Sequence, residues 1–325
     1  RRPLDPVDVD QLRNLYQTLL SEELSHDAAL RMLLARVLVA PAFLYRSEKA
    51  ATGADAAAVD QWELATRLSY FLWSSMPDDL LMASAASGSL SQPEVLRGHM
   101  HRMLSDNRSR RLATEFGAQW LHIRDFDRND EKSEQHFPEF SGMRADMYEE
   151  SLQFLTHLVQ ENASVLDLFD ADYTFLNESM AKYYGIPNVI GPQWRRVDGV
   201  RQYSRGGILG FASTLSKQSG ASRTSPILRG NWITEVVLGE KLPKPPKNVP
   251  PLPEDLPEGL TERQLIERHS SDAACSACHR RIDPFGFALE GFDAIGRFRQ
   301  ASTGEEKRDT RTTLPDGTPV DGIQD

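Results

Sequence analysis

Cysteine and long apolar runs are scarce in this sequence of 325 residues. Its only two cysteines lie three positions apart, so a disulfide between them would close a tiny loop and stabilise little. The richest apolar stretch, residues 33–44, is interrupted by Arg36 and Pro41 and is too short to span a bilayer. The sequence therefore offers no stabilising disulfide and no segment that resembles a membrane-spanning helix.

The sequence also lacks an excess of positive charge. Its 47 acidic residues outnumber its 37 lysines and arginines, which gives a formal net charge of −10. Nucleic acids and anionic membrane surfaces attract basic proteins, so both are poor candidate partners. A neutral or basic protein partner is compatible with this charge.

An initiator methionine and a signal-peptide pattern are missing as well, because the sequence begins at Arg1. We expect a chain that is processed, trimmed or part of a larger polypeptide or assembly. The final residues, 301–325, are turn-rich and include Leu314-Pro-Asp-Gly. We expect them to be the start of a C-terminal module that is cut short.

What the sequence does contain is helical periodicity almost throughout. Hydrophobic residues make up 40% and charged residues 26%, as is typical of a globular protein. A length of 325 residues exceeds one ordinary core and predicts two or three packed units. We therefore expect a mainly α, multi-module helical protein.

The pattern divides the first half of the chain into two helical modules. Residues 1–48 carry two apolar stripes, over 12–20 and 30–38, which predict a helical hairpin. Residues 49–57 have the composition of a soft linker. Residues 57–187 repeat the helical spacing of apolar side chains and are expected to form the central module.

The third expected module, residues 194–300, contains both cysteines. Its Thr224-Ser-Pro sequence predicts a capped helix that begins with a proline in the first turn. Residues 242–257 contain seven prolines and predict an extended strap in polyproline II form. Thr261 is expected to open a short helix directly before the cysteines.

The two cysteines form the motif Cys275-Ser-Ala-Cys278-His279. Covalent haem attachment needs two thiols that meet both vinyl groups along one edge of the porphyrin. Residues at i and i+3 lie on one face of a helical turn, and a histidine at i+4 can reach the iron from the same side. The motif therefore predicts one covalent haem c, bound through Cys275 and Cys278, with His279 as the proximal iron ligand.

Two other uses of the cysteines stay open. A zinc site needs about four ligands, and the sequence offers this pair with His279 and His269 nearby. A thioredoxin-like redox pair should open a helix after a strand in a βαβ unit, and no such pattern precedes residue 275. Both alternatives fit the sequence less well than haem attachment does.

Several stretches spread over nearly all of the chain are similar to a known family: residues 1–4, 39–48, 68–79, 173–178, 184–186, 224–230, 248–252, 275–299 and 313–317. They resemble large bacterial cytochrome c-like proteins that are built from serial domains of unknown function. The resemblance implies a C-terminal cytochrome c-like haem-binding module, export from the cytoplasm and this order of domains. It implies no established reaction.

The surroundings of the iron are only partly predicted by the motif. The second ring nitrogen of His279 should donate to a carbonyl or carboxylate, which the turn at Ile282-Asp-Pro could supply. Small cytochromes often place a methionine ligand downstream, but the last methionine here is Met180 and no histidine follows His279. His269 is therefore the nearest candidate for the distal ligand, and an open or water-bound position is the alternative.

Four further side chains are candidates for contact with the porphyrin. Arg280 and Arg281 could pair with the haem propionates through charge-assisted hydrogen bonds, or be a solvated basic pair. Phe285 and Phe287 could form a wall of the haem pocket, or belong to the ordinary core.

Three functions are compatible with these features. The first is electron transfer between an exported dehydrogenase and a soluble acceptor, with a redox partner that the sequence does not identify. The second is a haem enzyme of peroxidase type with an open distal site, and the third is a helical scaffold whose haem is structural or sensory. Because haem c is attached outside the cytoplasm, we expect a periplasmic or cell-surface location.

Overall fold

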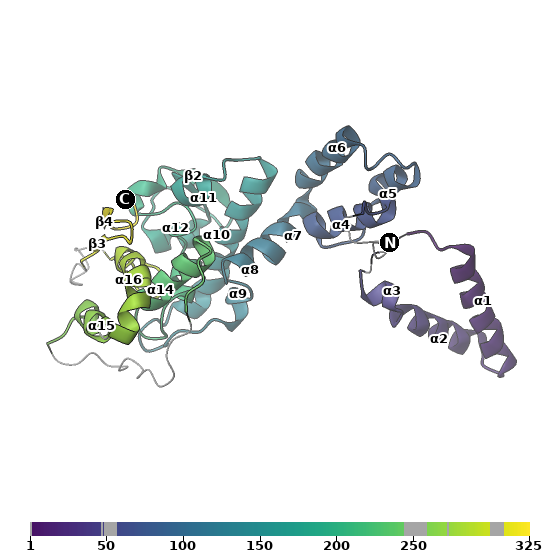
Figure 1. The fold of residues 1–325 in the computed structure, drawn as a ribbon, viewed down its shortest axis with the longest axis horizontal. Coiled ribbons are helices and arrows are strands. Elements are labelled where there is room, and N and C mark those ends of the chain that lie inside the picture. Colours follow the sequence, from purple (N-terminus) through teal and green to yellow (C-terminus); the bar gives the residue numbers. More distant parts are fainter. Residues whose placement is uncertain (1, 47, 49–56, 244–258, 272, 300–308) are drawn as a thin grey trace. The chain divides into compact units, whose positions relative to one another are not determined.

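The computed structural model describes residues 2–46, 48, 57–243, 259–271, 273–299 and 309–325 (Figure 1). Helices make up 56% of it and strands 6%, which confirms the prediction of a mainly α, multi-module protein. The chain divides into two compact units, Arg1–Leu112 and Ala113–Asp325. The module limits expected at residues 57–187 and 194–300 are not tested by this division and stay a prediction.

The described residues of the first unit are helical wherever they form regular structure. Its elements are α1 (Pro6–Ser21), α2 (His26–Leu38), α3 (Pro41–Leu44), α4 (Gln61–Trp73), α5 (Asp79–Ala86), α6 (Pro93–Leu104), η1 (Asn107–Ser109) and α7 (Arg110–Leu112). The predicted hairpin is present as α1 and α2, which pack against each other. Asp5 and Ser25 cap their N-termini by accepting from backbone N–H groups.

The core of the first unit lies in α4, α5, α6 and the turn before α6. Its buried members are Ala65, Leu72, Trp73, Leu81, Ala85, Leu90 and Met103. The indole of Trp73 donates to the carbonyl oxygen of Met103 at 2.9 Å, which satisfies the one polar group of this buried ring. Apolar burial around one tryptophan therefore joins α4 to α6.

The second unit contains more helices and two small sheets. Its elements are η2 (Ala113–Gly117), α8 (Ala118–Trp120), α9 (Phe126–Asn129), α10 (Phe140–Gln160), α11 (Asp167–Asp170), β1 (Tyr173–Leu176), α12 (Glu178–Tyr184), β2 (Arg195–Asp198), η3 (Val200–Tyr203), α13 (Ala212–Lys217), α14 (Pro226–Trp232), η4 (Ile233–Val237), α15 (Glu262–Ser270), α16 (Ala273–Ala288), β3 (Arg311–Thr313) and β4 (Pro319–Asp321). The segments η2 and η4 are π-helical.

Both sheets of the described residues are two-stranded and antiparallel. Strand β1 pairs with β2 so that Tyr173 lies opposite Asp198. Strand β3 pairs with β4 so that Arg311 lies opposite Asp321. The described part of the chain therefore contains no parallel βαβ unit, which is the setting that a thioredoxin-like cysteine pair requires.

The core of the second unit extends from the long helix α10 to the segment that follows α16. The ring of Phe154 on α10 lies 5.5 Å from that of Tyr173 and 5.2 Å from that of Phe211. Phe292 and Ile295, which follow α16, belong to the same buried cluster. The segment that follows the cysteine-bearing helix α16 therefore packs into the main core of the second unit.

Two predicted segments lie largely outside the described residues. They are the linker at 49–57 and the proline-rich strap at 242–257, of which only residues 57, 242 and 243 are described. In the ranges that are described, no helix has both the length and the apolar character needed to cross a bilayer.

Candidate functional site

Helix α16 carries the whole cysteine and histidine motif. Cys275 and Cys278 are free thiols, and both are half-buried. One helical turn separates them and His279 follows directly, so the three side chains share one face of the helix. The motif therefore lies on a helical turn, as covalent haem attachment requires.

Asp283 holds the imidazole of His279 in place. Its two carboxylate oxygens lie 2.9 Å and 3.1 Å from Nδ1. The side chains are only 12% and 8% exposed, so this contact is shielded from water. Because a carboxylate accepts hydrogen bonds, Nδ1 carries the proton and Nε2 is the nitrogen that can bind a metal. The expected acceptor in Ile282-Asp-Pro is thus the Asp283 side chain, within a helix rather than a turn.

Helix α16 runs through Pro284 without ending. Proline has no N–H, so the carbonyl of Arg280 loses its usual helical donor. The hydroxyl of Thr234 shares its proton between the carbonyl of Gly230 at 3.0 Å and that of Arg281 at 3.2 Å. A donor from η4 therefore supports α16 next to the point where the proline weakens its hydrogen bonding.

Two glycines let α14 and α16 approach each other backbone to backbone. A Cβ on Gly230 would lie 1.9 Å from the carbonyl oxygen of Ile282. A Cβ on Gly286 would lie 1.9 Å from the carbonyl oxygen of Pro226. No side chain fits at either position, so this crossing sets the depth at which α16 lies in the unit.

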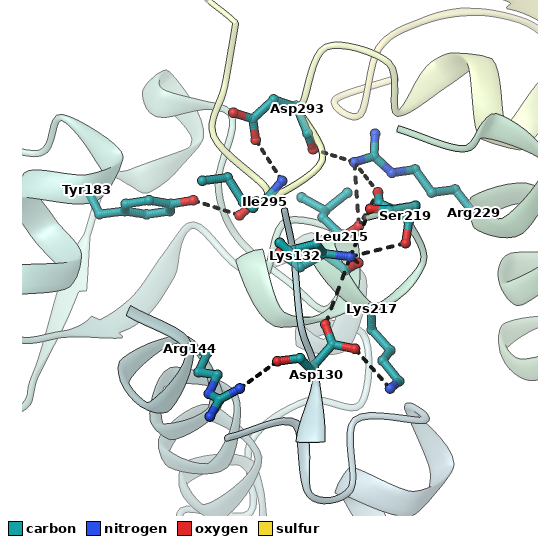
Figure 2. Close-up of polar contacts among 12 residues, drawn as sticks. Asp130, Lys132, Arg144, Tyr183, Leu215, Lys217, Ser219, Arg229, Asp293 and Ile295 are labelled. Atoms are coloured by element: carbon teal, nitrogen blue, oxygen red, sulfur yellow. Dashed lines mark hydrogen bonds and ion pairs between the residues drawn. The ribbon is translucent and has the colours of Figure 1, made fainter. Parts of the chain in front are cut away.

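Arg229, on α14, fixes the turn that follows α16 (Figure 2). Its guanidinium is fully buried and donates to the carbonyls of Leu289 at 2.8 Å, Phe292 at 3.1 Å and Asp293 at 2.6 Å. Glu290 lies 3.4 Å away and balances the charge. No local sequence pattern marks a single arginine as buried, so Arg229 is not among the residues predicted from the sequence.

Lys132 binds the segment that Arg229 also contacts (Figure 2). Its ammonium donates to the carbonyls of Ser216 at 2.7 Å, Ser219 at 3.1 Å and Gly220 at 3.2 Å. Burial lowers the pKa of Lys132 to about 8. Arg229 donates to the hydroxyl of Ser219 at 3.1 Å, so two buried cations meet at one loop and hold it beside the turn after α16.

Helix α15 is held between α16 and β3 by one arginine. The guanidinium of Arg263 lies 4.5 Å from the centre of the Phe287 ring. It also donates to the carbonyls of Asp309 at 3.3 Å and Arg311 at 2.8 Å. The helix that carries His269 is therefore anchored from its other end.

The structure brings together the two imidazoles that are predicted to bind the iron. The rings of His269 and His279 lie edge to face, with centroids 5.4 Å apart and planes 76° apart. Rings in this arrangement are in contact. A haem between them would therefore have to separate α15 from α16 at this point.

The other candidate residues lie in different surroundings. Arg280 is exposed and its Nε donates to the carbonyl of Ser276 at 3.3 Å. Arg281 forms an ion pair with Glu240. Phe285 is half-buried against the main core, and Phe287 is buried beneath Arg263.

A zinc site finds little support in the described residues. Among them, no group of three or more histidine, cysteine, aspartate or glutamate side chains is arranged to hold a metal ion. The pair formed by His279 and Asp283 is instead the kind of imidazole and carboxylate contact that orients a single metal-binding histidine.

Comparisons with known proteins give two partial matches. Residues 59–186 match a family model described as PSD4, protein of unknown function (DUF1592). Residues 205–302 match one described as PSCyt3, protein of unknown function (DUF1588). No curated protein and no solved structure matches the chain. The names of the two models hint at a cytochrome c-related family of serial domains whose function is unknown.

Proposed function

We propose that this chain contains a c-type cytochrome module that binds one haem covalently. In this proposal Cys275 and Cys278 form the two thioether bonds, and Nε2 of His279 binds the iron. The observation that carries the proposal is the shared face of α16, on which two free thiols and an oriented imidazole occupy one helical turn. The match of residues 205–302 to the PSCyt3 model also supports it.

The residues present fit such a group. Both thiols are half-buried, so an attached porphyrin would lie against the protein and be partly shielded from water. The His279 side chain directs its free nitrogen away from Asp283 because Nδ1 is occupied. Bound haem would supply a one-electron redox centre, and the chain would supply its position.

We extend the proposal to His269 as the distal iron ligand. It is half-buried and contacts the His279 ring, so separating α15 from α16 at this point would place it across a haem from His279. Two histidine ligands would give six-coordinate, low-spin iron, which is suited to electron transfer. The chain would then carry electrons to or from a redox partner in the periplasm or at the cell surface.

Maturation of the full chain in the periplasm of a host that attaches haem c tests the attachment. Intact mass under denaturing conditions should show one haem retained on the unfolded chain. The double variant Cys275→Ser, Cys278→Ser should lose it, whereas Ser276→Ala, which changes one of the two residues between them, should keep it. A matured wild-type chain that is colourless, with thiols that react freely, would refute the proposal.

A peroxidase-type enzyme is the second candidate, and the contact between His279 and Asp283 favours it. A carboxylate that accepts from the proximal imidazole raises the basicity of the iron ligand. Visible spectra of the ferric and ferrous states separate the two functions. Low-spin iron that does not react with peroxide supports electron transfer. High-spin ferric iron that reacts with peroxide supports a peroxidase-type enzyme.

A further inference from the structure

We infer that Asp283 is a positioning residue of the proposed haem site, which selects the iron-binding nitrogen of His279 and favours the ferric state. This inference rests on the proposed function, because it concerns the same histidine. It adds a redox property that the attachment motif alone does not contain.

The selection of the nitrogen follows from geometry. Both carboxylate oxygens of Asp283 approach the same ring atom, Nδ1, at 2.9 Å and 3.1 Å. The two residues are four positions apart on α16, so the helix itself sets their separation. The ring is thus held in the tautomer with the proton on Nδ1, and Nε2 is the nitrogen left free to bind iron.

The effect on the iron follows from burial and charge. The Asp283 side chain is 8% exposed, and the neighbouring arginines are engaged elsewhere, Arg280 with the Ser276 carbonyl and Arg281 with Glu240. Among the described contacts, the partner of this carboxylate is the His279 ring. Its negative charge therefore acts on the imidazole with little screening.

A carboxylate is a stronger acceptor than the neutral backbone carbonyl that could occupy the same place. It draws the Nδ1 proton and leaves more electron density on Nε2, which makes the histidine a more basic ligand. A more basic ligand stabilises ferric iron over ferrous iron, because ferric iron carries the higher charge. Asp283 should therefore lower the reduction potential.

The central test compares the midpoint potentials of the holoproteins. Asp283→Asn keeps the size of the side chain and removes its charge. We expect the preference for ferric over ferrous haem to fall about tenfold, which for one electron is a rise of about 59 mV. The control is Glu240→Gln, which removes a negative charge beside α16 without touching His279 and should leave the potential near the wild-type value.

Equal shifts in both variants, or no shift in Asp283→Asn with haem attached, would overturn the inference. Asp283→Glu, which restores the charge, should recover most of the wild-type potential.

A second measurement needs no variant. Nitrogen-15 NMR of the full chain before haem attachment, labelled at histidine, reports which ring nitrogen of His279 carries the proton. A protonated Nδ1 is expected, and a lone proton on Nε2 would contradict the inference. If the matured wild-type chain takes up no haem, the proposed function fails, and the NMR result separately decides whether Asp283 holds the ring.

Discussion

Glu150 makes the stability of the second unit depend on pH. This residue of α10 is fully buried and accepts hydrogen bonds from the hydroxyls of Thr174 at 2.7 Å and Tyr184 at 2.5 Å. Burial raises its pKa from an ordinary 4.5 to about 7, although both hydroxyls and Arg205 act in the opposite direction. Between pH 4.5 and about 7, Glu150 is therefore protonated in the folded chain and ionised in the unfolded chain.

The size of the effect follows from that difference in pKa. Below pH 4.5 both states are protonated and Glu150 contributes no slope. From pH 4.5 to about 7 the native state binds one more proton than the unfolded state, so stability falls by about 1.4 kcal/mol per pH unit. The loss over this window is about 3 kcal/mol, and no further loss from this group is expected at higher pH.

Glu150→Gln tests this reasoning because glutamine is neutral at every pH and keeps a similar shape. Its amide can accept from one hydroxyl and donate to the other, as a protonated carboxyl does. Urea unfolding can be read from hydrogen exchange of α10 peptides by mass spectrometry, so that the second unit is followed on its own. The stability of the variant relative to wild type should increase by about 3 kcal/mol between pH 4.5 and pH 8.

The comparison between the two chains cancels the titration of other groups. If wild type and Glu150→Gln show the same dependence on pH across this window, Glu150 is not protonated in the folded chain. The account of its burial would then be wrong.

Two further variants test the packing of α16. Gly286→Ala places a Cβ 1.9 Å from the Pro226 carbonyl oxygen and should destabilise the second unit by about 1–3 kcal/mol or more. The control is Gly142→Ala in α10, whose Cβ meets open space and should not destabilise the unit. Equal urea midpoints for the two would contradict the crossing. Arg229→Met removes the donor to three buried carbonyls and the ion pair between Arg229 and Glu290, so we expect a loss of about 3–5 kcal/mol by urea unfolding. A loss below about 0.5 kcal/mol would show that water replaces the guanidinium.

Local sequence signals predicted those parts of the fold that short-range physics decides. The capped helix after Thr224-Ser-Pro is present as α14 and η4, and Thr261 begins α15 with a reciprocal capping box. In each case the deciding hydrogen bonds or backbone preferences lie within a few residues of the signal.

Features that depend on distant partners were not predictable in the same way. Strand β1 has only four residues, and they gain their strand character by pairing with β2, so no local signal marks them. Lys132 and Arg229 look like ordinary surface residues in the sequence, and their burial depends on carbonyls far along the chain. The contact between His269 and His279 likewise required the packing of α15 on α16.

The glycine crossing of α14 and α16 supplies a way to recognise this module without its cysteines. Any related chain that keeps the same approach of the two helices must keep a residue without a side chain at the positions of Gly230 and Gly286. A sequence that has lost the thiols but retains both glycines would preserve the architecture without the proposed site of haem attachment. Such natural variants would separate the packing role of α16 from its proposed role in holding haem.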